Sequence, residues 1–375
     1  MTSPQSSPES SPPPFPFPRP ERRTHVAVSG PDPRLRGRER GRLLAAARLN
    51  GALDTYDRLF ALGGITPGAV RDDARRALDA IDAFRPALRE QIEGLAEGAA
   101  VEPWRIAALN ARTEILARSA AVPPGECSTI VSEAGGSPVG VQTWDWHVEL
   151  GPYWHTLESS GARHRYVGLT EHGIVAKIGV NSAGLALHFN ILGHRDDRVG
   201  GIPVHVLAAL VLEEADGVGH ARELIESAPI TSSGSFMLFD ASGTALLDLS
   251  PAGVFEAPRI AEGLHLRTNH FLTETPAARE KTWLYQPDSG ERFAFLRDRL
   301  TGGRPAPLAG DALLHQLITG PDEPPVTCVP APTAPLGSRW ASLATILLTP
   351  ATREARILDG TPAEHGTRPW ISLRA

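Results

Sequence analysis

Apolar residues in the first third of the chain recur at helical spacing. Between residues 40 and 118, leucine, alanine and aromatic side chains return every three or four positions, as at Tyr56 and Phe60. Pro103 stands where a helix would begin, since a first helical turn tolerates proline. A short apolar stretch at 24–30 precedes this region. The pattern therefore predicts one strand followed by mostly helix up to residue 118.

From residue 127 onward the pattern changes to short β-rich runs separated by turn sequences such as NSAG at 181–184. Helices first, then antiparallel strands with inserted helices, indicate an α+β fold. We expect strands at 165–170, 174–180, 185–192, 236–239, 244–249, 264–268, 344–348 and 355–358, and helices at 203–215, 218–227 and 290–300.

The N-terminal end has a different composition. Serine and proline dominate it, and they offer little that a core could bury. We interpret residues 1–23 as a disordered tail. Its prolines leave open a role as a ligand for an SH3-type domain.

The charge balance and the rarity of lysine narrow the function classes. The chain has 37 Lys+Arg against 43 Asp+Glu, a net charge of −6, whereas nucleic-acid binding requires a basic surface. Lys177 and Lys281 are the only lysines, and neither lies in a phosphate-binding Gly-Lys-Ser/Thr loop. The patterns Ser-x-x-Lys, Gly-x-Ser-x-Gly and His-Glu-x-x-His do not occur. Phosphate-loop ATPases, ordinary serine hydrolases and zincin metalloproteases are therefore disfavoured, and no metal or cofactor is predicted.

Cys127 and Cys328 are too few for a disulfide framework or a zinc ribbon. One disulfide between them stays open, and we interpret Cys328 as a packed thiol. No apolar run reaches the roughly 18 residues of a membrane span. The N-terminus also lacks the basic-then-apolar layout of a signal peptide. We therefore expect a cytoplasmic protein without membrane or nucleic-acid partners.

Cys127 stands where helical sequence gives way to strands, directly after the loop VPPGE at 122–126. A single cysteine is ordinarily a small buried hydrophobe. At the edge of a strand, however, an exposed thiol can attack the peptide bond that precedes it. Here that bond joins Glu126 to Cys127.

Asp145 lies between two tryptophans in the sequence TWDWH. An acid in such a strand is either a solvent-facing residue of an edge strand or a buried carboxylate that orients another polar group, since a buried carboxylate needs such partners. The nearby His147, His188 and His270 are interpreted as structural.

Several segments that occur in a fixed order resemble a known family. They are GECSTIV around Cys127, the Trp-Asp pair at 144–145, GVNSAGLALHFN at 179–190, LRTNHF at 266–271, GSRWASLATILLTPATREARI at 337–357 and a Gly-Arg…Gly stretch at 37–41. Together they resemble the autoproteolytic acyltransferases of peptidase family C45, typified by fungal isopenicillin N acyltransferase. That enzyme has Gly directly before the cysteine, whereas this chain has Glu126, with Gly125 one place earlier.

The resemblance implies an N-terminal nucleophile hydrolase, which is a four-layer αββα sandwich made as an inactive precursor that cleaves itself before the cysteine. Residues 24–126 would then form a helix-rich leader and residues 127–375 the catalytic chain, together one fold. The apolar residues of 40–118, which can form a core, indicate that the leader stays bound. The family requires no cofactor.

The resemblance also assigns roles to single residues. It implies Cys127 as the nucleophile, Asp145 as its orienting acid and Arg339 as an essential arginine. Asn190 and Asn269 resemble the amides that bind the oxyanion. From the residues alone, other interpretations stay open: Asn190 as a strand-end turn residue, Asn269 as a loop cap and Arg339 as a surface arginine.

The chemistry of these roles needs no lysine or histidine. Self-cleavage would free an α-amine with a reference pKa of ~7.7–8.0 beside a thiol of ~8.5, so the amine can take the thiol proton near neutral pH. An amide donor at the developing oxyanion is worth ~3–4 kcal/mol.

We therefore predict an amidohydrolase or acyltransferase that acts through a thioester on a small-molecule amide or an acyl donor such as acyl-coenzyme A. The alternative is a catalytically degenerate relative that keeps the fold and binds small molecules or proteins. A papain-like protease is disfavoured, because its cysteine lies on a helix whereas CSTIVS at 127–132 reads as a strand.

Overall fold

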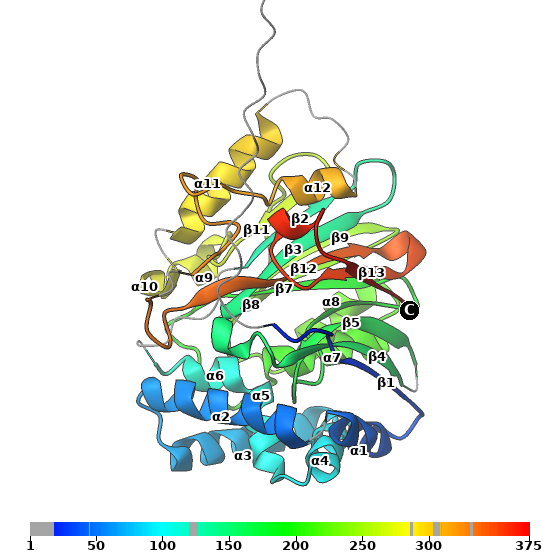
Figure 1. Cartoon of the computed structure of the whole chain (residues 1–375), viewed down its shortest axis with the longest axis vertical. Coiled ribbons are helices and arrows are strands. Elements are labelled where there is room, and N and C mark those ends of the chain that lie inside the picture. The colour runs from blue at the N-terminus through cyan, green and yellow to red at the C-terminus, as the bar shows by residue number, and fades with distance from the viewer. Residues whose placement is uncertain are drawn as a thin grey trace, which may run out of the picture.

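The computed structural model describes residues 19–44, 46–119, 127–161, 163–285, 288–302, 308, 310–330 and 333–375. Its centre is a pair of β-sheets with helices outside them (Figure 1). Most of the predicted tail, residues 1–18, and the predicted cleavage residue Glu126 lie outside the described residues. None of the described helices combines the length and the apolar character that crossing a bilayer requires.

The larger sheet has eight strands among the described residues, in the order β1-β4-β5-β6-β7-β8-β9-β10. Their bounds are β1 (His25–Ser29), β4 (Trp154–Ser160), β5 (Arg165–Glu171), β6 (Ile178–Asn181), β7 (Ala186–Ile191), β8 (Gly234–Asp240), β9 (Gly243–Ser250) and β10 (Gly253–Glu256). Neighbours are antiparallel except β1, which lies parallel to β4 at the edge. The first predicted strand is thus part of a sheet formed by much later residues.

The smaller sheet is antiparallel, with the order β11-β2-β3-β12-β13-β14. Its strands are β2 (Ser128–Ser132), β3 (Val139–His147), β11 (Leu264–Arg267), β12 (Trp340–Thr349), β13 (Glu354–Leu358) and β14 (Trp370–Arg374). Strands β2 and β3 lie inside this sheet, so Asp145 is on an internal strand and not on an edge.

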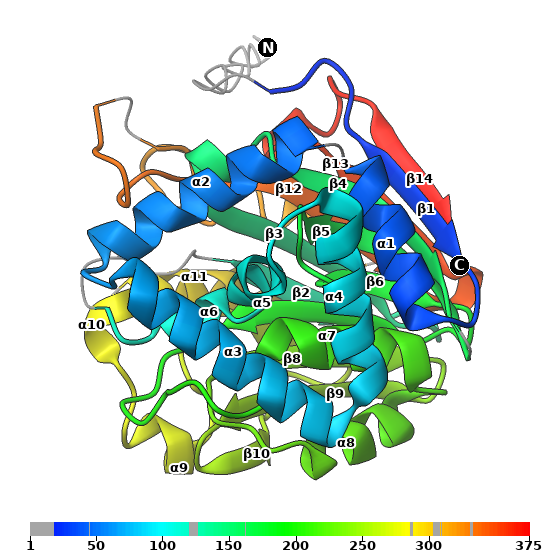
Figure 2. The same ribbon diagram turned by 90° about the horizontal axis from the view of Figure 1, so that it is seen from below.

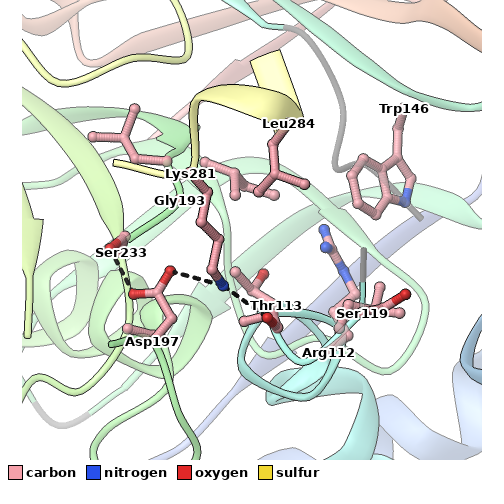
Figure 3. Close-up of a pocket in the computed structure, with 14 residues that line it drawn as sticks. Arg112, Thr113, Ser119, Trp146, Gly193, Asp197, Ser233, Lys281 and Leu284 are labelled. Carbon is pink, nitrogen blue, oxygen red and sulfur yellow. Dashed lines mark hydrogen bonds and ion pairs between the residues drawn. The ribbon is translucent and has the colours of Figure 1, made fainter. Parts of the chain in front are cut away.

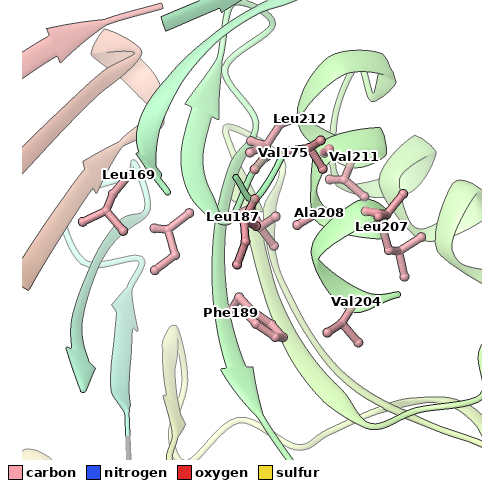
Figure 4. Close-up of a cluster of buried hydrophobic side chains, with 14 of the residues drawn as sticks. Leu169, Val175, Leu187, Phe189, Val204, Leu207, Ala208, Val211 and Leu212 are labelled. Atoms are coloured by element: carbon pink, nitrogen blue, oxygen red, sulfur yellow. The ribbon is translucent and has the colours of Figure 1, made fainter. Parts of the chain in front are cut away.

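The two sheets pack face to face between two helical layers. Helices α7 (Val204–Glu214) and α8 (Val218–Ser227) cover the larger sheet, and α11 (Asp288–Thr301) and α12 (Asp311–His315) cover the smaller one. Figure 4 shows Val204 and Ala208 of α7 beside Phe189 and Leu187 of β7 in one buried cluster. The order helix, sheet, sheet, helix confirms the predicted four-layer αββα sandwich of an α+β protein.

The predicted helical region before residue 118 is also confirmed. It forms α1 (Pro33–Leu43), α2 (Ala46–Leu62), α3 (Pro67–Phe84), α4 (Pro86–Ala99), α5 (Pro103–Asn110) and α6 (Arg112–Leu116). Figure 2 shows this group from below, lying across one end of the sandwich. The short helices α9 (Glu274–Ala277) and α10 (Thr282–Tyr285) precede α11 along the chain.

Glycines allow α1 and α4 to cross at very short range. Gly37 and Gly41 of α1 face α4, and Gly94 and Gly98 of α4 face α1. A Cβ on any of the four would collide with backbone of the facing helix. The Gly-Arg…Gly stretch that contributed to the family resemblance is therefore a helix-crossing surface.

The predicted strand at 174–180 begins only at Ile178, because leader side chains bind the backbone before it. Arg40 donates from Nη1 to the Val175 carbonyl at 2.7 Å and also bonds the Ile174 carbonyl. The Val175 amide donates to Asn110 Oδ1 at 2.9 Å. These backbone groups are satisfied without a neighbouring strand.

One further boundary differs from the sequence expectations. Arg19 and Arg23, inside the predicted tail, form ion pairs with Glu364 at 2.8 Å and with Asp359 at 2.7 Å.

In the charged run at 194–198, the Asp197 side chain is buried, with only 3% exposed. Ser233 and the backbone amide of His194 bind that carboxylate at 2.6 and 2.7 Å, which compensates its burial.

Candidate active site

Cys127 immediately precedes β2 at the inner part of the smaller sheet, and it is 5% exposed. The register pairs Ser128 with Thr143 of β3, which brings the cysteine beside the end of that strand. Its Sγ lies 3.8 Å from the backbone carbonyl of Asp145. The sheet pairing thus unites the two residues that the sequence separates by eighteen positions.

Two donors from different elements bind the carbonyl of Cys127. Asn190 of β7 donates from Nδ2 at 3.0 Å, and Arg292 of α11 donates from Nη1 at 3.3 Å. The Asn190 amide is oriented by Thr129, whose hydroxyl donates to Oδ1 at 2.7 Å, and by Gln142 Nε2 at 3.2 Å. Because both bonds end on the amide oxygen, the amide nitrogen faces Cys127.

Asn269 lies on the same side of the site. Its Nδ2 donates to the Ile191 carbonyl at 2.9 Å, and its Oδ1 accepts from Arg292 Nη2 at 3.3 Å. Its backbone amide donates to Ser289 Oγ at 2.7 Å. Asn269 and Cys127 therefore share one partner, the buried guanidinium of Arg292, and Asn190 binds the same Cys127 carbonyl as Arg292.

Asp145 is fully buried, so its interpretation as a solvent-facing residue of an edge strand is wrong. Alternation along β3 turns Thr143 and Asp145 to one face of the sheet and the tryptophans to the other. Thr143 donates to Asp145 Oδ2 at 3.2 Å and accepts from the Ser128 amide at 3.2 Å. Thr143 thereby links the Asp145 carboxylate to the backbone at the start of β2 by two hydrogen bonds.

Arg339 lies directly before β12, beside the segment that follows β3. Its guanidinium forms an ion pair with Glu149, and its carbonyl accepts from the Val148 amide at 3.0 Å. Its side chain is 25% exposed. Glu149 and Val148 are thus not among the residues that contact Cys127. Those residues are Asp145, Asn190 and Arg292.

Burial and the carboxylate of Asp145 raise the pKa of the Cys127 thiol to about 12, while the cations of Lys177 and Arg292 act in the opposite direction. At neutral pH the thiol of the uncleaved chain is therefore protonated. A nucleophilic role requires a proton acceptor close to the sulfur.

Trp146 lines one wall of a small cavity. Apolar side chains including Leu116, Ile191 and Leu284 line it, together with Arg112, Thr113, Ser119, Asp197, Ser233 and Lys281 (Figure 3). Lys281 Nζ donates to the Ala117 carbonyl at 2.7 Å and lies 3.9 Å from Asp197 Oδ2. The cavity leaves about 20 Å³ for the centre of a water molecule, which is room for water and not for an acyl chain.

Sequence reasoning missed Arg292, Gln142, Thr129, Thr143 and Lys177. Asp288 and Arg292 stand at i and i+4 of one helix, as in a surface ion pair, although Arg292 is fully buried. For Thr129 and Gln142 a signal existed, since they pair directly across β2 and β3 and so must share a face. No disulfide joins Cys127 and Cys328, and Cys328 is buried as predicted.

Comparison with known proteins identifies the family of the chain. The family model of acyl-coenzyme A:6-aminopenicillanic acid acyl-transferase matches residues 131–363, more than half of the chain. The 40 kDa form of acyl-coenzyme A:6-aminopenicillanic-acid-acyltransferase from Emericella nidulans is 28% identical over 219 residues, covering 58% of this chain and 60% of that protein. The match thus spans less than two thirds of that relative.

Similar solved structures include penicillin V acylase from Agrobacterium tumefaciens, 15% identical with a TM-score of 0.42, covering 66% of this chain and 86% of the other. A second is the Caenorhabditis elegans ortholog of N-acylethanolamine-hydrolyzing acid amidase, 14% identical with a TM-score of 0.42, covering 60% and 93%. On the extent of the family match, the chain belongs to the acyl-coenzyme A:6-aminopenicillanic acid acyl-transferase family.

Proposed function

We propose that the protein is an N-terminal-cysteine amidohydrolase or acyltransferase that matures by cutting itself between Glu126 and Cys127. The proposal is carried by one observation: at Cys127, just before β2, the sulfur contacts the Asp145 carbonyl, while Asn190 and Arg292 bind the Cys127 carbonyl and Arg292 also binds Asn269. Four of the residues that the family resemblance assigned therefore meet at one place from four separate strands and loops.

Maturation would proceed by an acyl shift. The sulfur of Cys127 attacks the carbonyl carbon of Glu126, the C–N bond breaks, and the nitrogen takes a proton to become the α-amine of Cys127. Water then hydrolyses the thioester and leaves Glu126 as a carboxylate. The products are a leader ending at 126 and a catalytic chain starting at 127.

In the mature protein the α-amine would act as the base. It takes the thiol proton while the sulfur attacks a substrate carbonyl, then gives that proton to the leaving amine. Water or a second amine removes the acyl group from the thioester. Asn190 and Asn269 are the donors we assign to the oxyanion, and Arg339 stays a proposed functional arginine.

The cavity beside Trp146 is the place we assign to the acyl group of a small amide or of an acyl donor. Its apolar wall of Leu116, Ile191 and Leu284 suits an acyl chain, and Ile191 directly follows Asn190. The cavity has to widen when such a group enters. The name of the family makes acyl-coenzyme A one donor to test.

Denaturing electrophoresis of the purified chain tests the proposal. Self-cleavage would convert the 40.1 kDa chain into two pieces, residues 1–126 and residues 127–375, the second about twice as long as the first. Cys127→Ala should stay whole and inactive, while Cys328→Ala, the matched change at the other buried cysteine, should cleave normally. A wild-type chain that remains intact yet binds small amides would instead support the degenerate binding protein.

A further inference from the structure

Lys177, one of the two lysines, lies in a buried cluster that the proposed reaction does not use. Its side chain is 2% exposed, and its Nζ is 2.8 Å from Glu171 Oε1. The ammonium also lies 4.5 Å from the centre of the Trp144 ring and 5.8 Å from that of Trp146. The pairing of Ser128 with Thr143 places Cys127 across from Trp144, so the lysine lies against the tryptophan that is opposite the cysteine.

The leader helices hold the partner of Lys177 in place. Arg112 of α6 donates to the same Glu171 Oε1 at 2.7 Å, and the hydroxyl of Tyr56 on α2 bonds the other carboxylate oxygen. The Trp146 indole donates to that hydroxyl at 2.9 Å. The cluster therefore joins residues before the proposed cleavage site to residues after it.

One carboxylate in this cluster serves two cations, so Glu171 compensates only part of their charge. Glu114 of α6 accepts hydrogen bonds from the Ser232 hydroxyl and the Val204 amide. Its carboxylate raises the pKa of Arg112, so it compensates part of the Arg112 charge.

His147 and His205 also face the cluster. Burial lowers the pKa of both, so they stay neutral at pH 7. The guanidinium of Arg112 and the ammonium of Lys177 are left as the cations against the tryptophans. Of these two cations, Lys177 is the one whose charge shifts the pKa of Cys127.

The positive charge of Lys177 acts on the sulfur. It lowers the pKa of the Cys127 thiol against the effects of burial and Asp145, and the cysteine in turn raises the pKa of Lys177. The pKa of Lys177 itself falls to about 8, chiefly through burial, so the group is still mostly protonated at pH 7. A cation next to a cysteine favours the thiolate, which is the nucleophilic form.

We propose that Lys177 is a positioning residue for the reaction under "Proposed function": held by Glu171 and through it by Arg112 and Tyr56 of the leader, its ammonium stabilises the thiolate of Cys127. The inference rests on the proposed function. The effect of the Lys177 charge on the reactivity of the sulfur can nevertheless be measured without turnover.

The test is the pH dependence with which iodoacetamide alkylates Cys127 in the purified full-length protein, quantified by peptide mass spectrometry so that Cys328 is counted separately. Lys177→Met should slow alkylation about tenfold at pH 7, where Lys177 is mostly protonated, and the difference should shrink above pH 8, where Lys177 loses its charge. Lys177→Arg, which keeps the charge, should restore most of the rate at pH 7. Arg222→Met removes an exposed cation on α8 and should leave that rate unchanged.

A rate of alkylation at pH 7 in Lys177→Met equal to that of the wild type overturns the proposal. If Lys177→Met does not fold, Lys177→Gln replaces it, because glutamine keeps a donor for Glu171 without the charge, and the same two outcomes apply. Alkylation requires no self-cleavage. An intact wild-type chain would therefore refute the proposed function, whereas an unchanged rate of alkylation at pH 7 would refute the role of Lys177.

Discussion

At the scale of single residues, the orientation of one amide decides what the site can do. Thr129 and Gln142 both bond Asn190 Oδ1, which leaves its nitrogen for the Cys127 carbonyl. From its residues alone, the sequence left Asn190 open as a strand-end turn residue. It could not show which atoms would meet, because Thr129, Gln142 and Asn190 come from three strands in two different sheets.

Asn190→Asp should therefore slow self-cleavage about tenfold, because the loss of the bond to the Cys127 carbonyl weakens the hold on the cysteine by about 1.5 kcal/mol. The change keeps the shape of the side chain but replaces the donor that faces Cys127 with an acceptor. The fraction of cleaved chain at increasing times after cell-free synthesis measures it. Asn181→Asp, at a buried asparagine that bonds the Leu212 and Ala215 carbonyls, is the matched control. If the control slows cleavage equally, general misfolding and not the Cys127 contact is responsible.

Asp197 gives the pocket a pH dependence. Burial raises its pKa to about 6, against the bonds from Ser233 and His194 and the nearby Lys281 cation. A raised folded-state pKa means that stability is fullest below the unfolded value near 4 and is lost as pH rises through 6. Relative to Asp197→Asn, the wild type should lose about 3 kcal/mol between pH 4 and 7.

Urea unfolding at several pH values, with both proteins carrying Cys127→Ala so that neither can cleave, measures this difference. A wild-type chain whose free energy of unfolding rises relative to Asp197→Asn over the same range would contradict the raised pKa.

At the scale of elements, periodicity predicted most of the long helices and most strands, but not the short helices α9, α10 and α12 or the contacts between elements. The stretch at 174–177 has the composition of a strand, yet side chains of Arg40 and Asn110 bind its backbone. Those bonds connect residues 65 to 135 positions apart, beyond the reach of any local pattern. Strand β6 begins directly after Lys177, and the ammonium of that lysine is bonded to Glu171.

The α1–α4 crossing gives a stability prediction. Gly94→Ala should destabilise the protein by about 3 kcal/mol, because the added Cβ collides with the Arg34 carbonyl of the facing helix, and backbone cannot give way cheaply. Gly68→Ala on α3, where a Cβ meets nothing within 4 Å, should be neutral or slightly stabilising. Urea midpoints of the two variants compare the effects. Equal midpoints would mean that the crossing relaxes.

At the scale of the whole molecule, the leader is part of the fold. β1 pairs with β4 in the larger sheet, and Arg112 and Tyr56 complete the cluster around Glu171. The helical character of the leader was readable from the sequence. The sequence did not show that this segment adds a strand to a sheet and side chains to a buried charge cluster. Both depend on partners that lie far along the chain or in another layer.

We therefore expect the two chains to stay together after cleavage. On size exclusion without denaturant, the leader and the catalytic chain should co-elute at a size no smaller than the intact 40.1 kDa chain. Arg112 and Glu171 would otherwise each lose a buried partner, at a cost of about 3–5 kcal/mol. Elution of a folded catalytic chain without the leader would contradict the shared fold.

The central claim is that self-cleavage turns Cys127 into an N-terminal nucleophile. A cyanobenzothiazole reagent tests it most directly, since it condenses only with a cysteine whose α-amine is free. The account predicts label on the longer of the two chains of the wild type, on a peptide that begins at Cys127, and no label on Cys127→Ala. An intact, unlabelled wild-type chain would contradict it.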